Sequence, residues 1–179
     1  MALQDTLDRL IVDVQDFPEP GIVFKDITPL LADHDGFTEV IEALAAAGRD
    51  ESGRPVVDKV LGMEARGFIL AAPVALALGA GFVPVRKAGK LPRKTHAVSY
   101  SLEYGKATLE LHCDAVAPGE RVLLIDDVIA TGGTVAATVD LVRRSGAEVV
   151  GVAALMELVA LEGRTAIGSD VPVTVLMQV

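Results

Sequence analysis

Hydrophobic residues recur along the 179-residue chain at two kinds of spacing, which predict alternating helices and strands. Spacings of three and four residues predict helices over residues 2–15, 37–48, 66–78 and 135–144. Short apolar runs predict strands over residues 59–63, 82–86, 122–125, 148–156 and 173–177, with a short extended piece over residues 22–26. This order predicts an α/β fold with a mostly parallel sheet flanked by helices.

A different pattern occupies the polar stretch 96–105, where apolar side chains alternate with polar ones. This alternation predicts an exposed β-ribbon that turns near Gly105 and returns over residues 108–112. The sequence has no internal repeat, linker or low-complexity segment. We therefore expect one domain over residues 1–179.

Composition narrows the class of protein. Hydrophobic residues make up 51% of the chain and aromatic residues only 4%, so the core is expected to be aliphatic. The longest apolar run, 68–80, is shorter than the roughly 20 residues that span a bilayer, and the first residues do not resemble a signal peptide. With Cys113 as the single cysteine, these features predict a cytoplasmic protein. The net charge of −9 argues against general binding to nucleic acids.

The most informative segment is 122–134, which reads VLLIDDVIATGGT. Its apolar start predicts a buried strand, and the small residues that follow predict a loop opening into a helix. Such a loop presents free backbone N–H groups and the positive end of the helix dipole to a phosphate. The two carboxylates, Asp126 and Asp127, suit sugar hydroxyls or a hydrated Mg²⁺. Many other α/β proteins share a strand that ends in Asp and turns through glycines, so this segment alone leaves both interpretations open.

One basic run stands out in this acidic chain. Residues 86–94 carry five basic side chains and no acidic one, directly after a predicted strand. A polyanionic substrate needs such a patch, although a solvated loop is the usual explanation of a charge run. The pyrophosphate-facing interpretation is favoured for Arg86 and Lys87, and both interpretations stay open for Lys90.

Five blocks of sequence, in this order, resemble one family: 17–29 (FPEPGIVFKDITP), 64–68 (EARGF), 83–92 (VPVRKAGKLP), 99–105 (SYSLEYG) and the 126–134 loop. They are similar to the type I phosphoribosyltransferases, and within that family to the members that act on adenine. The resemblance implies the type I phosphoribosyltransferase core, a small N-terminal hood within about residues 1–35 and a flexible β-ribbon lid over about residues 95–110. It also implies a homodimer, dependence on Mg²⁺, and the reaction of adenine with phosphoribosyl pyrophosphate to give AMP and pyrophosphate.

The resemblance also implies roles for particular residues. The 5′-phosphate would lie in the loop of Ala130, Thr131, Gly132, Gly133 and Thr134. Asp126 and Asp127 would face the ribose, with Mg²⁺ held mainly by the substrate and reached by these carboxylates through water. Pyrophosphate would be bound by Arg66, Arg86, Lys87 and Lys90, some of them from the partner subunit.

The base side is also assigned by resemblance. Adenine would be bordered by Val23, Phe24, Lys25 and Leu158, with Phe24 stacked on the ring. Glu103 would act as general acid/base on the base, and Tyr104 would help to close the lid. From the residues alone, Glu103 reads as a solvated strand residue, and Val23 and Phe24 read as ordinary core. Two rival functions remain: a transferase for another base, such as xanthine, and a non-catalytic regulator that senses phosphoribosyl pyrophosphate.

Overall fold

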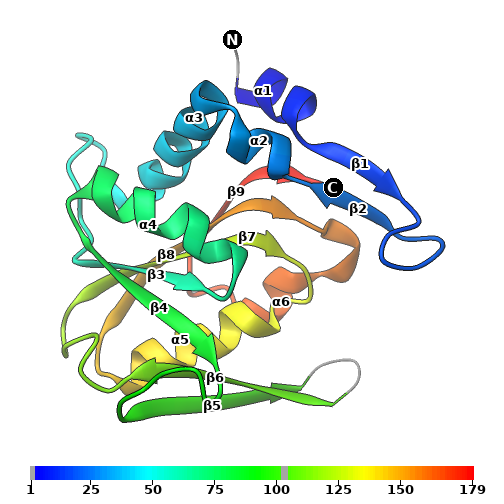
Figure 1. Cartoon of the computed structure of the whole chain (residues 1–179). Coiled ribbons are helices and arrows are strands. Elements are labelled where there is room, and N and C mark those ends of the chain that lie inside the picture. The colour runs from blue at the N-terminus through cyan, green and yellow to red at the C-terminus, as the bar shows by residue number, and fades with distance from the viewer. Residues whose placement is uncertain (1–2, 102–104) are drawn as a thin grey trace.

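A seven-stranded sheet forms the centre of the protein in a computed structural model that describes residues 3–101 and 105–179. The strand order is β5-β6-β4-β3-β7-β8-β9 (Figure 1). The strands are β3 (Lys59–Met63), β4 (Gly81–Lys87), β5 (Thr95–Ser101), β6 (Lys106–His112), β7 (Arg121–Ile129), β8 (Glu148–Glu157) and β9 (Val173–Gln178). Strands β4, β3, β7, β8 and β9 run parallel, whereas β5 and β6 are antiparallel to their neighbours. The α/β expectation is confirmed.

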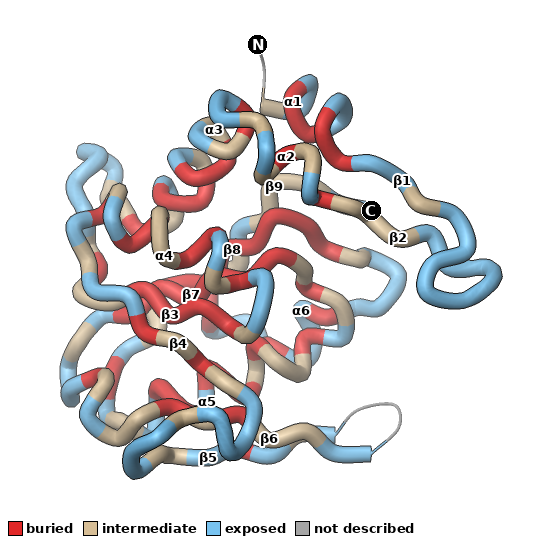
Figure 2. The backbone as a smooth tube through the Cα atoms, viewed as in Figure 1, coloured by how far each residue is buried: buried red, intermediate tan, exposed pale blue. Residues whose placement is uncertain are grey.

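Helices cover both faces of this sheet. Helices α3 (His34–Ala45) and α4 (Arg66–Leu78) pack on one face, and α5 (Gly133–Arg144) packs on the other beside the short helix α6 (Gly163–Ile167) (Figure 1). Each face has its own cluster of buried aliphatic side chains, and the buried residues follow the central strands (Figure 2). No helix among the described residues is long and apolar enough to cross a membrane.

The N-terminal segment differs from its prediction. The helix expected over residues 2–15 is only α1 (Leu3–Leu10), and the chain continues as β1 (Val12–Gln15). Strand β1 pairs with β2 (Val23–Asp26) in an antiparallel hairpin, set apart from the main sheet (Figure 1). The alternating Val12-Asp13-Val14 favours a strand once a partner is available, because β-branched side chains suit a pleated surface. Helix α2 (Thr28–Ala32) then leads back towards the sheet.

Two other elements have boundaries that differ from those predicted. The strand expected over 122–125 continues to Ile129, so Asp126 and Asp127 lie inside β7 and not after it. Strand β7 pairs with β8 as far as Ile129, opposite Glu157. This continued pairing keeps Asp126 and Asp127 in the extended strand. The helix expected from residue 37 begins at His34, because the Asp33 side chain caps it by accepting a hydrogen bond from the Gly36 N–H at 2.8 Å. It ends in the 3₁₀ turn η1 (Ala46–Gly48).

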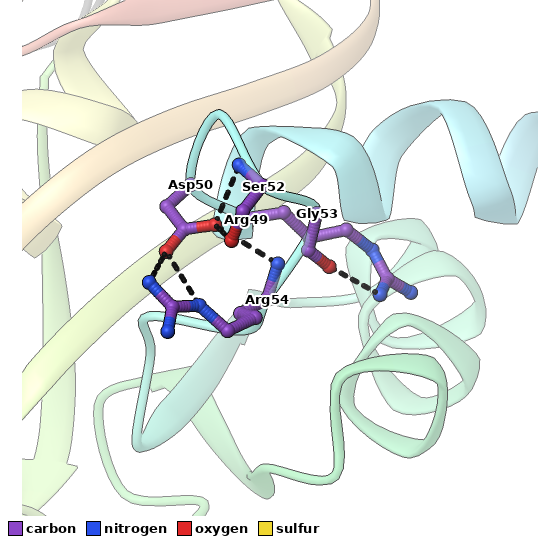
Figure 3. Close-up of polar contacts among 5 residues, drawn as sticks. All are labelled: Arg49, Asp50, Ser52, Gly53 and Arg54. Atoms are coloured by element: carbon purple, nitrogen blue, oxygen red, sulfur yellow. Dashed lines mark hydrogen bonds and ion pairs between the residues drawn. The ribbon is translucent and has the colours of Figure 1, made fainter.

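A compact turn connects η1 to the amino end of β3 (Figure 3). The Asp50 carboxylate accepts hydrogen bonds from the Ser52 N–H at 2.9 Å and the Arg54 N–H at 3.0 Å. Arg49 donates to the carbonyl oxygens of Gly53 at 3.2 Å and of Ala77, at the end of α4, at 3.1 Å. These contacts close the turn and tie it to the end of α4, shortly before β3 begins at Lys59.

Candidate active site

A cavity of about 310 Å³ lies at the carboxyl ends of β3 and β7. The chain leaves β3 towards β4 on one side and leaves β7 towards β8 on the other, so this is a topological switch point of the sheet. Ligands of open α/β sheets bind at such points. The cavity is lined by residues 64–66 and 126–135. The structure therefore brings together the predicted phosphate loop, the paired carboxylates and Arg66.

The loop 130–132 is shaped by Gly132, which has a φ of +79°. This left-handed conformation favours glycine. Helix α5 begins at the next residue, and no side chain of the described residues caps it. Its first N–H groups are therefore left for a ligand, and the helix dipole makes an anion the preferred one.

A close backbone contact behind the loop was not found by sequence reasoning. A Cβ on Gly163 would lie 2.3 Å from the Ala130 carbonyl oxygen, and a Cβ on Gly132 would lie 2.1 Å from the Gly163 carbonyl oxygen. The loop and the start of α6 are thus packed main chain against main chain. A single glycine in a short helix gives no pattern that would have revealed this contact.

Strand β5 supports the same loop from another side. The Tyr100 ring lies 3.0 Å from the position that a Cβ on Gly133 would take. The Tyr100 hydroxyl makes a hydrogen bond of 3.1 Å with the Thr134 hydroxyl. The predicted β-ribbon is therefore confirmed as β5–β6, and it contacts the phosphate loop through Tyr100. Glu103 and Tyr104 lie outside the described residues.

The two carboxylates of β7 are both buried, with Asp126 9% and Asp127 7% exposed. Asp127 forms an ion pair with the Nε of Arg66. Its backbone N–H donates to Asp126 Oδ1 at 2.9 Å. Burial raises the pKa of Asp126 well above its usual range, and the charge of Asp127 raises it further. The pair thus combines one carboxylate held by a cation with one that resists ionisation.

The basic residues at the end of β4 and just after it surround a further carboxylate, that of Glu64. Glu64, with its side chain 8% exposed, forms ion pairs with Lys90 and with Arg86, whose Nε is 3.4 Å away. It also accepts a hydrogen bond from the Lys87 N–H at 3.0 Å. Burial acts to raise the pKa of Glu64, but these donors outweigh it and lower the pKa to about 2. Glu64 belongs to the block 64–68, but the sequence assigns it no role, because it does not show which cations contact this carboxylate.

The hairpin β1–β2 reaches this site through Phe24. The Arg66 guanidinium carbon lies 5.8 Å from the centre of the Phe24 ring, a cation–π contact. Phe17 packs edge-on against the same ring at 5.2 Å. Val23 is 46% exposed, and Lys25 is paired with Asp13 at 2.6 Å. Phe24 thus contacts Arg66 of the cavity lining, but none of Val23, Phe24 and Lys25 lines the cavity itself.

Leu158 follows the end of β8, and its N–H donates to the Ile129 carbonyl at 2.9 Å. This bond places it beside the end of β7, next to the phosphate loop. The neighbouring Glu157 is buried and holds Arg164 of α6 through its Nε at 2.8 Å. Leu158, Arg86, Lys87 and Lys90 do not line the cavity itself.

The carboxylates fit a lightly held divalent cation. Asp126 and Asp127 offer the oxygen ligands that Mg²⁺ prefers. Within residues 3–101 and 105–179, no cluster of three or more acidic, histidine or cysteine side chains could hold a metal by itself. The donor set therefore fits an ion that brings most of its ligands with it, as substrate phosphates and water.

A phosphate-type loop at the switch point of a parallel sheet, beside two buried carboxylates, defines an α/β enzyme for a sugar phosphate. Residues 30–167 match the phosphoribosyl transferase domain family. The chain is 70% identical to an adenine phosphoribosyltransferase of Nocardioides sp., over 95% of this chain and 91% of the relative. It therefore belongs to the phosphoribosyltransferase family, among the adenine phosphoribosyltransferases, and is a transferase.

Solved structures give the same result. The adenine phosphoribosyltransferase of Rhodothermus marinus is 52% identical with a TM-score of 0.91, and the match covers 99% of this chain and 98% of that one. The enzyme of Saccharomyces cerevisiae is 36% identical with a TM-score of 0.91, over 97% of this chain and 98% of that one. The yeast structure is a complex with adenine and D-2,5-dideoxy-2,5-imino-altritol 1,6-bisphosphate.

Proposed function

We propose that the chain transfers the phosphoribosyl group of phosphoribosyl pyrophosphate to adenine, which yields AMP and pyrophosphate and salvages the purine. The observation that carries this proposal is the single cavity shared by the phosphate loop, the Asp126–Asp127 pair and Arg66. The yeast relative, which was solved with adenine and a bisphosphate sugar analogue, supports both halves of the substrate pair.

The reaction breaks the bond from ribose C1 to a pyrophosphate oxygen, and pyrophosphate leaves with the electron pair. Nitrogen N9 of adenine forms the new bond to C1, and a proton leaves the base. The transition state resembles an oxocarbenium ion, as in glycoside hydrolysis. The protein must therefore stabilise the leaving charge, hold the ring and position the base.

The phosphoribosyl half is assigned to β7 and the loop after it. The 5′-phosphate is held by backbone N–H groups of the loop, which consists of Ala130, Thr131, Gly132, Gly133 and Thr134. Asp126 and Asp127 face the ribose hydroxyls. Mg²⁺, held mainly by the substrate, would neutralise part of the pyrophosphate charge. Arg66, Arg86, Lys87 and Lys90 would take up the rest.

The base half is assigned to the hairpin and to Leu158. Phe24 stacks on adenine, and its neighbours Val23 and Lys25 offer backbone groups to the polar edge of the ring. A carbonyl there accepts from the 6-amino group and leaves a 6-oxo group unpaired, which can discriminate strongly. Glu103, outside the described residues, is the proposed general acid/base, and Tyr104 its proposed companion in the lid. The hood and lid boundaries, the homodimer and the cytoplasmic location stay predictions.

The direct test is product formation with phosphoribosyl pyrophosphate and Mg²⁺, with adenine, hypoxanthine, guanine, xanthine and orotate offered separately. We expect AMP from adenine and no product from the 6-oxo purines. Turnover of xanthine in place of adenine would leave the residues assigned to the phosphoribosyl group unchallenged. It would refute the assignment of residues 23–25 and Leu158 to adenine. Nucleotide binding without turnover of any base would instead identify a regulator.

A further inference from the structure

A carboxylate lies at the centre of the basic edge, the group of Arg86, Lys87 and Lys90 that is proposed to bind pyrophosphate. The Glu64 side chain is largely buried, and its three described donors come from the end of β4 and the residues just after it: Arg86, the Lys87 N–H and Lys90. Arg86 also donates to the Lys90 carbonyl at 3.4 Å. An anion is an unexpected group in a site for a polyanion, since like charges repel.

The same donors cannot serve two anions fully. An N–H that is hydrogen-bonded to Glu64 is not available to pyrophosphate, so the substrate must displace the carboxylate from that donor or share the two cations with it. Glu64 is ionised at neutral pH, because its pKa is about 2. It also lines the cavity next to Arg66. The competition therefore takes place at the border between the cavity and the basic edge.

We infer that Glu64 is a built-in counterion that competes with pyrophosphate for Arg86 and Lys90 and thereby limits how tightly the leaving group is held. Glu64 is a positioning residue, because it acts through these two cations and not on the reacting atoms. The inference rests on the proposed function, which assigns the two cations to pyrophosphate. Its consequence is faster release of pyrophosphate after transfer.

A purely structural role predicts the opposite sign. If Glu64 only held the segment 86–90 in shape, its removal would loosen the cations and weaken pyrophosphate binding. If Glu64 competes, its removal strengthens binding, because the cations no longer have to leave an existing partner. Structural damage does not produce tighter binding, so the direction of the change separates the two roles.

The test is the affinity of the whole protein for pyrophosphate with Mg²⁺, measured by calorimetry for wild type and Glu64→Gln. The amide keeps the shape and an oxygen for the Lys87 N–H but removes the charge. We expect binding about three- to tenfold tighter, the size of one partly buried ion pair. Product inhibition by pyrophosphate should become stronger by the same factor. Unchanged or weaker binding would overturn the inference.

Two further variants complete the design. Glu110→Gln is the matched control, because Glu110 accepts from the Gly89 N–H at 3.0 Å in the same segment but does not line the cavity. It should change the affinity much less than Glu64→Gln. Glu64→Asp, which withdraws the charge by one methylene, should tighten binding by a smaller factor. It replaces Glu64→Gln as the test variant if Glu64→Gln does not fold.

Lys90→Met separates this inference from the proposed function on which it rests. Loss of the cation should weaken pyrophosphate binding in the otherwise unchanged protein. If it does not, the assignment of the basic edge to pyrophosphate is wrong. If Lys90→Met weakens binding while Glu64→Gln fails to strengthen it, only the competition is wrong.

Discussion

The loop 130–134 and the β1–β2 hairpin, which are proposed to bind the 5′-phosphate and the base, are held in different ways. The loop follows a buried strand and packs backbone against backbone on Gly163, at distances where no added Cβ fits. The hairpin has four residues in each strand, all of them exposed or partly exposed. Lys25 pairs with Asp13 and Phe17 packs on Phe24 within the hairpin, and Phe24 in turn contacts Arg66.

This difference fits the two tasks. A phosphate has a fixed shape and a concentrated negative charge, and backbone groups fixed by packing suit it at little cost in side-chain entropy. A flat base is recognised by stacking and by a few polar groups, which an exposed hairpin can supply. We therefore expect substitutions behind the loop to damage nucleotide binding as a whole, and substitutions in the hairpin to affect the base alone.

The largest expected effect is at Glu103, the proposed general acid/base, which lies outside the described residues. Glu103→Gln should lower turnover by about 10²–10⁴-fold, the usual contribution of general acid/base catalysis. Binding of phosphoribosyl pyrophosphate should stay nearly unchanged, because the residue is proposed to act on the base. Steady-state kinetics and calorimetry measure the two quantities separately. Glu51→Gln, in the exposed turn before β3, is the control. Near wild-type turnover in Glu103→Gln would refute the assignment.

Gly163→Ala should have the next largest effect, since the new Cβ would lie 2.3 Å from the Ala130 carbonyl oxygen. Overpacking of this kind costs about 1–3 kcal/mol, and the loop must move to relieve it. We expect AMP affinity to fall by about tenfold or more, with a lower melting temperature. Gly151→Ala is the matched control, because its Cβ would lie 3.6 Å from its nearest neighbour. Equal AMP affinity in Gly163→Ala and wild type would show that the contact does not shape the loop.

Phe24→Ala should have a smaller effect, confined to the base. Stacking of a base on an aromatic ring contributes about 1–3 kcal/mol, so the KM for adenine should rise about tenfold. The KM for phosphoribosyl pyrophosphate should change little. Phe24→Tyr, which keeps the ring, should restore most of the adenine affinity. A rise in both KM values to the same extent would indicate that the hairpin supports the whole site and not only the base.

The smallest effect concerns stability, at Asp126. Burial and the nearby Asp127 raise its pKa, so its ionised form destabilises the folded state. The free energy of unfolding should therefore decrease as pH rises above the ordinary value of 3.8 towards the raised value. Asp126→Asn, whose amide oxygen can still accept the Asp127 N–H, should remove this dependence and raise the melting temperature at pH 7 by a few degrees, roughly. It should also weaken ribose binding. An unchanged pH profile of thermal unfolding would contradict the raised pKa.

The sequence predicted the phosphate side of this comparison better than the base side. The apolar run before Asp126 and the glycines after it are local features, and local features determine a strand, a loop and a helix start. The helix expected over residues 2–15 ends at Leu10, because pairing with β2 decided the segment that follows. No local pattern could show that Gly163 backs the loop or that Glu64 meets Arg86 and Lys90, since these contacts join residues far apart in the chain.

The division of the site into a phosphate side and a base side is tested most directly by a crystal structure of the AMP complex. The account predicts the 5′-phosphate within hydrogen-bonding distance of the backbone N–H groups of residues 131–134, and the adenine ring stacked on Phe24. A phosphate bound at the basic edge of Arg86 and Lys90, or an adenine away from the hairpin, would contradict it.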